Sequence, residues 1–259
     1  MNNPNTEIKR WGIVVIQSLK PNDVKTGENL YKDLLQYKSY SNKDCFSSFY
    51  NVHSIREFSS AITEIGNSLI DGDILTLQIE THGCEQGLGL SNDDLLNWKD
   101  FYDMIRPLNI KTGHLLFVIM SMCKSIAMIS SINPEERAPY RAFVCTTRIV
   151  NSDEIYRGFM AFYENYYNLL DIAQALKSLQ EEVKDKNGFS PFQILTAESV
   201  FDDTFNPNRN ISDLVNLQLE RLNLPNTEIT RSIMSDSIRR LLKELHDRFC
   251  DYYNFKDLF

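Results

Sequence analysis

The sequence lacks an excess of basic residues and long apolar runs. Its 27 Lys and Arg are outnumbered by 35 Asp and Glu, which gives a net charge of −8. This balance argues against a nucleic-acid partner, because phosphate contacts need clustered basic side chains. No run of ~18 apolar residues occurs, so we expect neither a membrane-spanning helix nor a membrane partner. The first residues also lack the basic start and apolar segment of a signal peptide.

Paired cysteines are missing as well. The odd number of cysteines is spread over Cys45, Cys84, Cys123, Cys145 and Cys250. Disulfide frameworks and common zinc sites need paired spacings, so we expect a reducing, cytoplasmic setting. His82, Cys84 and Cys123 could in principle bind zinc, but no fourth ligand is evident. We therefore expect no metal and no cofactor.

Three motifs of nucleotide-binding proteins and hydrolases are absent. The sequence contains no Gly-x4-Gly-Lys-Ser/Thr phosphate loop and no Gly-x-Gly-x-x-Gly after a strand. It also contains no Gly-x-Ser-x-Gly. These absences argue against a P-loop nucleotide site, a dinucleotide site and a serine hydrolase.

Short apolar runs alternate with helical patterns over most of the 259 residues. The runs, each of which predicts a buried strand, lie at 11–19, 46–52, 74–81, 115–122, 141–147 and 192–196. The segments with helical periodicity lie at 26–40, 55–69, 92–108, 124–131, 153–168 and 171–184. This alternation predicts an α/β fold with a mostly parallel sheet.

A second, smaller region is expected at the C-terminal end. The polar segment at 201–210 is the best candidate for a boundary or a long loop. Helical patterns follow at 211–223 and 226–252. We therefore predict a main domain at 1–200 and a helical extension at 201–259, packed on that domain or on a partner.

Two neighbouring strands each end in a reactive side chain. The strand at 74–81 runs into His82, and the strand at 115–122 runs into Cys123. The chain between them has room for one helix, which demands a parallel pair with both carboxyl ends at one edge of the sheet. Open α/β sheets bind ligands at that edge. We expect His82 and Cys123 to meet there as base and nucleophile.

A single cysteine is more often an inert core residue, but the position of Cys123 favours chemistry. It follows a strand, and the N-terminus of the helix expected after it would lower the thiol pKa. The neutral ring of His82 could take the thiol proton and later donate one to a leaving amine. The N–H groups of Gly83 and Cys123 could form an oxyanion hole. We expect this dyad to need no third acidic residue.

The segments around these residues resemble caspase-like cysteine peptidases, especially their bacterial and CHAT-type branch. The similarity covers roughly 12–179 and rests on Ile79-Glu80-Thr81-His82-Gly83, Gly87-Leu88-Gly89-Leu90-Ser91, Ser121-Met122-Cys123-Lys124-Ser125 and Phe143-Val144-Cys145-Thr146-Thr147. The resemblance implies a caspase-like three-layer α/β/α sandwich and hydrolysis of protein or peptide substrates by a His82/Cys123 dyad. It also implies a regulated bacterial effector of antiviral defence or cell death. One departure is that the family's Gln-Ala-Cys-x-Gly is here Ser-Met-Cys-Lys-Ser.

The resemblance also suggests substrate contacts. Thr147 and Arg148 occupy the loop that helps form the S1 wall in caspase-like folds, and Arg148 could accept an acidic P1 side chain, the residue before the scissile bond. A plain surface arginine is the alternative. Asp153 could equally select a basic P1 residue, and Glu80 could orient His82 or line the pocket.

A different class of function stays open, namely a catalytically silent module that keeps the fold and binds a partner. The intact His82/Cys123 pair favours the enzyme. We further expect a peptidase of this kind to be restrained until an activating partner or a small-molecule signal arrives, with the helices from about 211 onward as candidates for the restraint.

Overall fold

The computed structural model describes residues 10–169 and 171–258 and divides the chain into two compact units. The sheet unit comprises the chain up to Ile132 and Ala138–Thr196, and the helical unit comprises Asn133–Arg137 and the chain from Ala197 onward. Most of the N-terminal segment, where we expected no signal peptide, lies outside the described residues. Over the ranges that are described, no helix combines the length and apolar character needed to cross a membrane.

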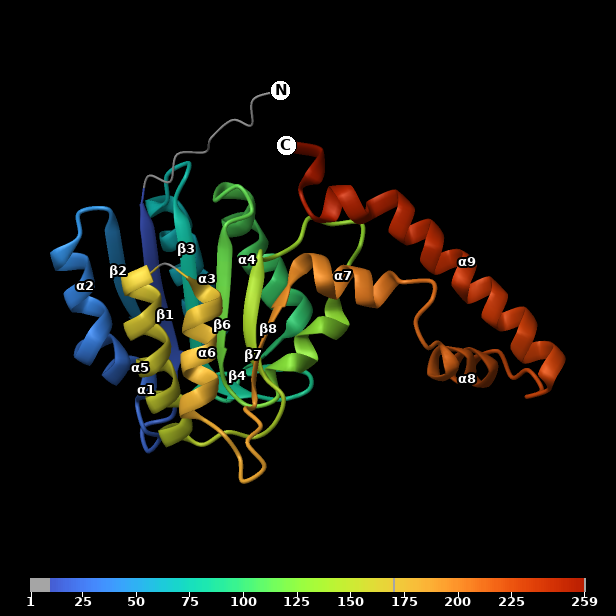
Figure 1. Ribbon diagram of the computed structural model, residues 1–259, viewed down its shortest axis with the longest axis horizontal. Helices are drawn as coiled ribbons and strands as arrows, with labels where there is room; N and C mark the ends of the chain where they lie inside the picture. The colour runs from blue at the N-terminus through green and yellow to red at the C-terminus, as the bar shows by residue number, and fades with distance from the viewer. Residues whose placement is uncertain (1–9, 170, 259) are drawn as a thin grey trace. The chain divides into compact units, whose positions relative to one another are not determined.

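The sheet unit is built on a central sheet with the strand order β2-β1-β3-β6-β7-β8 (Figure 1). The strands are β1 (Trp11–Ser18), β2 (Cys45–Asn51), β3 (Ile74–Gly83), β6 (Leu116–Ser121), β7 (Ala142–Thr146) and β8 (Phe192–Thr196). All neighbouring pairs are parallel except β7 and β8, which are antiparallel. The prediction of a mostly parallel α/β sheet is confirmed.

Helices cover both faces of this sheet, which makes the three layers of the predicted sandwich (Figure 1). One face carries α1 (Thr26–Leu30), a π-helical turn (Tyr31–Leu35), α2 (Gln36–Ser41), α5 (Ser152–Leu169) and α6 (Ile172–Glu182). The other face carries α3 (Ile55–Ser68) and α4 (Trp98–Lys111). Ser54 caps α3 by accepting a hydrogen bond from the N–H of Glu57 at 3.3 Å, as the capping pattern predicts.

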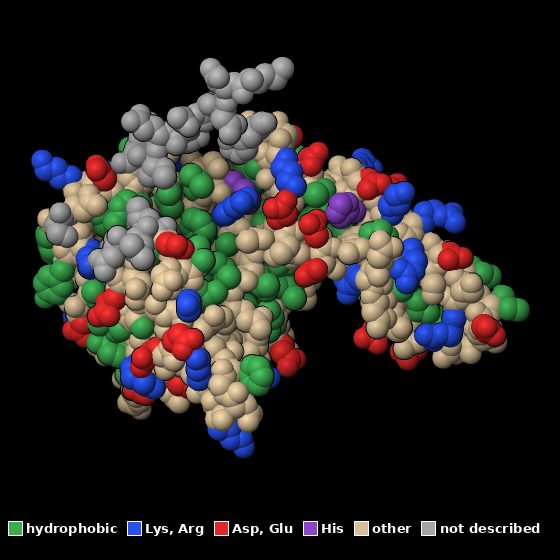
Figure 2. Space-filling view, viewed as in Figure 1, with side chains coloured by type: hydrophobic (Ala, Val, Ile, Leu, Met, Phe, Trp, Pro, Cys, Tyr) green, Lys and Arg blue, Asp and Glu red, His purple; other side chains and the backbone are tan. Residues whose placement is uncertain are grey.

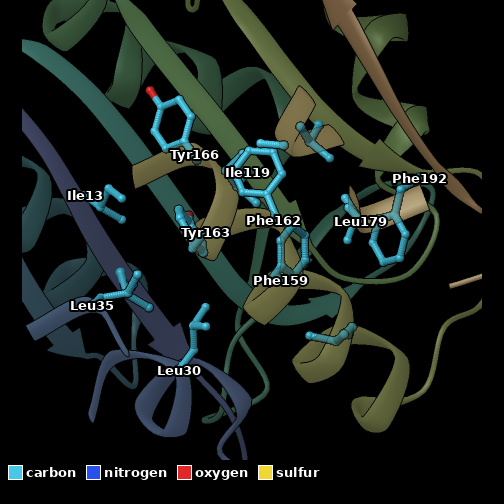
Figure 3. Close-up of a cluster of buried hydrophobic side chains, with 14 of the residues drawn as sticks. Ile13, Leu30, Leu35, Ile119, Phe159, Phe162, Tyr163, Tyr166, Leu179 and Phe192 are labelled. Carbon is cyan, nitrogen blue, oxygen red and sulfur yellow. The ribbon is translucent and has the colours of Figure 1, made fainter. Parts of the chain in front are cut away.

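The aromatic stripe of α5 fills the space between this helix and the sheet. Phe159, Phe162, Tyr163 and Tyr166 recur at helical spacing, so they share one face of α5. Figure 3 shows these rings beside Ile13 and Ile119 of the sheet and beside Leu30 and Leu35 of the α1 side, and all are buried together. Burying a large apolar side chain contributes about 1.5–3 kcal/mol, so this cluster holds α5 firmly on the sheet.

The helix predicted at 92–108 begins later and ends later than expected. Leu95–Asn97 forms a short strand, β5, which pairs with β4 (Gly87–Gly89) in a hairpin beyond the end of β3. The side chain of Asn97 caps α4 by accepting from the N–H of Asp100 at 2.9 Å. The helix also continues past Pro107 to Lys111. Burial of Ile105 and Leu108 on the two sides of the proline keeps the helix intact there.

The helical unit contains α7 (Ala197–Phe205), α8 (Ser212–Arg221), α9 (Glu228–Tyr253) and a final 3-10 turn (Lys256–Leu258). The segment 201–210, predicted as a boundary or a long loop, is helical in its first half, because α7 continues to Phe205. The rings of Phe201 and Phe205 pack at a tilt with centroids 4.8 Å apart, and the ring centroid of Phe201 also lies 4.8 Å from that of Tyr253 of α9. This aromatic packing stabilises α7, although the polar residues around Phe201 and Phe205 in the sequence suggest a loop.

Side chains of both charges are interspersed over the visible face (Figure 2). The pattern is that of an ordinary solvated surface.

Candidate active site

His82 and Cys123 line one cavity of about 210 Å³ at the carboxyl edge of the sheet. The cavity walls come from the loop after β1, the ends of β3 and β6, and the start of α5. In the register of the sheet, Glu80 of β3 lies opposite Ser121 of β6. His82 and Cys123 each follow two residues later, so the parallel pairing brings both to the same level.

Gly83 fits tightly against the loop that holds Cys123. A Cβ atom at Gly83 would lie 2.2 Å from the carbonyl oxygen of Cys123 and 2.9 Å from Cγ of Met122. No side chain has room there. The two N–H groups that the sequence predicts for an oxyanion hole, those of Gly83 and Cys123, therefore belong to segments in direct contact.

The turn after Cys123 differs from the expected helix start. Lys124 adopts a left-handed conformation with φ of +55°, and a 3-10 helix follows at Ser125–Ser131. The helix predicted at 124–131 is therefore present as a 3-10 helix that begins at Ser125, and not as an α-helix. The Cys123 thiol is half-buried and donates to the carbonyl oxygen of Val150 at 3.5 Å.

Ser125, which replaces the glycine of the caspase motif, has a structural partner. Its hydroxyl is buried and accepts from the N–H of Thr146 at 2.9 Å, while the hydroxyl of Thr146 donates to the carbonyl oxygen of Met122. These hydrogen bonds link the loop that holds Cys123 to Thr146 at the end of β7. Ser125, although it departs from the motif, therefore stabilises this loop.

The imidazole of His82 contacts a carboxylate that the sequence interpretation missed. Nε2 of His82 lies 2.9 Å from Oδ2 of Asp23, in the loop after β1. Hydrogen bonding to His82 lowers the pKa of the Asp23 carboxyl, and the N–H of Lys20 also donates to this carboxylate, at 2.8 Å. A carboxylate can only accept here, so Nε2 carries the proton. Nδ1 is left as the ring nitrogen that can accept a proton from a thiol.

The sequence indicates that Asp23 lies at this edge of the sheet, but the order of the strands is needed to place it beside His82. Asp23 follows a buried parallel strand, as His82 and Cys123 do, so it had to emerge at the same edge of the sheet. Only the pairing of β1 with β3, where Ser18 lies opposite Thr81, places that loop beside His82.

Glu80 lies in the cavity wall and is fully buried. Oε2 accepts from the hydroxyl of Thr26 at 2.7 Å, and Oε1 accepts from the side-chain amide of Gln78 at 2.6 Å. Burial raises the pKa of this carboxyl to about 7, and these two donors partly offset the rise. The buried hydroxyl of Ser121 faces the Glu80 carboxyl and also lowers this pKa, although the two groups do not meet the distance and angle of a hydrogen bond.

The remaining predicted substrate residues do not line this cavity. Thr147 donates from its hydroxyl to the carbonyl oxygen of Pro191 at 3.2 Å. Arg148 forms an ion pair with Glu154 at 2.7 Å. Asp153 similarly pairs with an arginine one turn further along α5, at 2.9 Å. Of the substrate contacts predicted from the sequence, only Glu80 lines the same cavity as Cys123.

Potential metal ligands gather elsewhere. Within the described ranges, the group of three ligand atoms lying within 4.8 Å of one another comprises Asp202, His246 and Cys250 of the helical unit. His82, Cys84 and Cys123, the zinc candidates from the sequence, do not form such a group.

Comparison with known proteins gives a likeness in structure alone. The sequence matches no protein-family model, and no curated protein matches it. The crystal structure of the Drosophila initiator caspase Dronc aligns with this chain at a TM-score of 0.50 and 11% sequence identity. The alignment covers 73% of this chain and 80% of that chain. The caspase-like fold suggested by the sequence is thereby confirmed, and at this identity the likeness speaks for the fold only.

Proposed function

We propose that this protein is a caspase-like cysteine peptidase that hydrolyses peptide bonds. Cys123 is the nucleophile and His82 the general base. The observation that supports this most directly is the meeting of His82 and Cys123 on the wall of one cavity, with Gly83 pressed against the Cys123 carbonyl. A caspase-like fold that keeps a thiol and an imidazole at this edge has the parts that acyl transfer needs.

The reaction follows from these positions. Nδ1 of His82 takes the thiol proton, and the Cys123 thiolate attacks the carbonyl carbon of the scissile bond. The N–H groups of Gly83 and Cys123 hold the resulting oxyanion. His82 then returns the proton to the leaving amine, and a water molecule hydrolyses the acyl-enzyme by the same route. Asp23 holds the ring in the required tautomer and stabilises the imidazolium as it forms.

The resting position of the thiol suggests a restraint. Because the Cys123 thiol donates to the Val150 carbonyl, its proton faces away from a base until that contact breaks. Val150 lies just before α5, so a shift of this segment would free the thiol. Small loop shifts of this kind gate many active sites. This supports the prediction of a weakly active resting state that a partner or signal relieves.

Labelling with a thiol-directed peptidyl electrophile tests the proposal. We expect one adduct, on Cys123, that is lost in Cys123→Ala and strongly slowed in His82→Ala. Cys84 is the matched control, because it lines a neighbouring cavity together with Gly83 and Cys123. Labelling of Cys84 alone, mapped by peptide mass spectrometry, would refute the assignment.

The competing function is a silent binding module. The departures from the caspase motif at Met122 and Ser125 are an argument for such a module, but the hydrogen bond between Ser125 and Thr146 gives the serine a structural role. Peptide hydrolysis that disappears in Cys123→Ala would exclude a silent module. The role as a bacterial defence or cell-death effector is a further proposal from the resemblance, tested by comparing growth of cells that express the wild type and Cys123→Ala.

A further inference from the structure

Glu80 lies one step below the reactive residues on the same side of the sheet. It precedes His82 by two positions, and Ser121 precedes Cys123 by two. Residues two apart in a strand share a face, and the step is about 6.6 Å at 3.3 Å per residue. Glu80 and Ser121 therefore form the floor of a cavity whose rim holds the nucleophile.

The size of the cavity suits one long side chain. Its volume of about 210 Å³ equals that of roughly seven water molecules at about 30 Å³ each. Small-molecule sites are larger, typically 300–1,000 Å³. A side chain that enters at the rim and ends at Glu80 must span the step between the two levels, which a long unbranched side chain does and a short one does not.

The charges around the cavity are acidic. Its lining includes the carboxyl groups of Asp23 and Glu80 but no lysine or arginine. Two cations from neighbouring loops have partners of their own: Lys25 donates to the carbonyl oxygen of Leu19, and Arg148 pairs with Glu154. An acidic side chain would have to approach Glu80 without a basic partner, and such like-charge contacts cost several kcal/mol.

Among the residues that the structure describes, no cation forms an ion pair with Glu80. Its two oxygens accept from neutral donors, Thr26 and Gln78. A buried carboxylate without a cation is costly, and the raised pKa of Glu80 reflects this cost. An ammonium or guanidinium group in the cavity would supply the missing charge.

We propose that the cavity is the S1 pocket and that Glu80 selects substrates with lysine or arginine at P1, an inference that rests on the proposed peptidase function. The basic side chain enters past Cys123 and ends at the Glu80 carboxylate, with the Ser121 hydroxyl beside it. The substrate class is therefore a peptide cleaved after a basic residue.

A set of matched covalent probes tests this proposal. The probes are peptidyl chloromethyl ketones that differ only at P1: arginine, lysine, glutamine, leucine or aspartate. We expect Cys123 of the full chain to react with the arginine and lysine probes at least ~100-fold faster than with the aspartate probe. In Glu80→Gln the advantage of arginine over glutamine should fall about tenfold or more. The rate with iodoacetamide, which has no P1 group, is measured for each variant and used to normalise the probe rates for any change in the reactivity of Cys123 itself.

Two controls keep the outcomes distinct. Asp103→Asn removes a carboxylate that pairs with Lys99 and Arg106 of α4, none of which lines the cavity, and should leave the P1 profile unchanged. If Glu80→Gln does not fold by circular dichroism, Glu80→Asp and the wild-type profile replace it. Labelling of Cys123 without a basic preference, or with an acidic one, overturns this inference alone. Failure of every probe to label Cys123 overturns the proposed function and the inference with it.

Discussion

Nε2 of His82 lies 2.9 Å from Oδ2 of Asp23, across 59 residues of sequence. The contact joins the loop after β1 to the end of β3, two strands that are neighbours in the sheet. It adds a carboxylate to the proposed His82/Cys123 dyad and leaves Nδ1 as the ring nitrogen that can accept a proton. The first prediction follows from it.

Removing the Asp23 charge should slow catalysis. We expect Asp23→Asn to lower kcat by about tenfold or more, because the imidazolium that forms on His82 loses its carboxylate. Full pH profiles of kcat/KM for the wild type and the variant measure the effect. The matched control is Asp93→Asn, since Asp93 forms an ion pair with Lys20 and does not touch His82. Equal loss in both variants would show that the effect is not specific to Asp23.

Gly83 should tolerate no side chain. In Gly83→Ala the new Cβ would lie 2.2 Å from the Cys123 carbonyl oxygen, so the backbone must move. We expect a loss of about 1–3 kcal/mol in the free energy of unfolding and loss of peptide hydrolysis. Gly89 pairs with His82 in the adjacent strand, and a Cβ atom at Gly89 would lie 3.6 Å from its nearest neighbour, the carbonyl oxygen of His82. Gly89→Ala should therefore keep both stability and activity, and urea unfolding of the two variants makes the comparison.

Glu80 should make stability fall as pH rises toward neutrality. Its carboxyl has a pKa of about 7 in the folded protein against an ordinary value of 4.5. Between these values the folded state holds a proton that the unfolded state has released, so stability decreases with increasing pH. The total effect is up to about 3 kcal/mol. Urea unfolding from pH 4 to 8 measures the free energy of unfolding of both proteins. The difference between Glu80→Gln and the wild type should shift in favour of the variant as the pH rises to about 7. Parallel curves would contradict the prediction.

Arg137 should stabilise the end of the helical unit. Its guanidinium forms a two-pronged ion pair with Asp257 and lies 4.2 Å from the ring centroid of Tyr252 and 4.8 Å from that of Phe255. We expect Arg137→Ala to cost about 1–2 kcal/mol of unfolding free energy. Arg157 is the control, because its ion pairs with Asp153 and Glu182 are exposed. Arg157→Ala should change stability by less than about 1 kcal/mol in chemical unfolding.

The sequence by itself determined the strands of the sheet and the edge of the sheet at which His82 and Cys123 lie. Apolar runs and the aromatic stripe of α5 are local patterns, and each reports burial of one face of one element. The rule that a strand–helix–strand unit is parallel placed His82 and Cys123 at one edge without further information. These inferences needed no contact between distant segments.

Only the tertiary structure decided what surrounds those two residues. Asp23 reaches His82 because β1 pairs with β3, and Glu80 lines the same cavity as Cys123 because it is in register with Ser121. Arg148 forms an ion pair with Glu154 and does not line the cavity. Each outcome depends on strand order, register or ion pairing between parts of the chain that have no fixed spacing in sequence. Local periodicity holds no information about such pairings, which arise when the whole sheet packs.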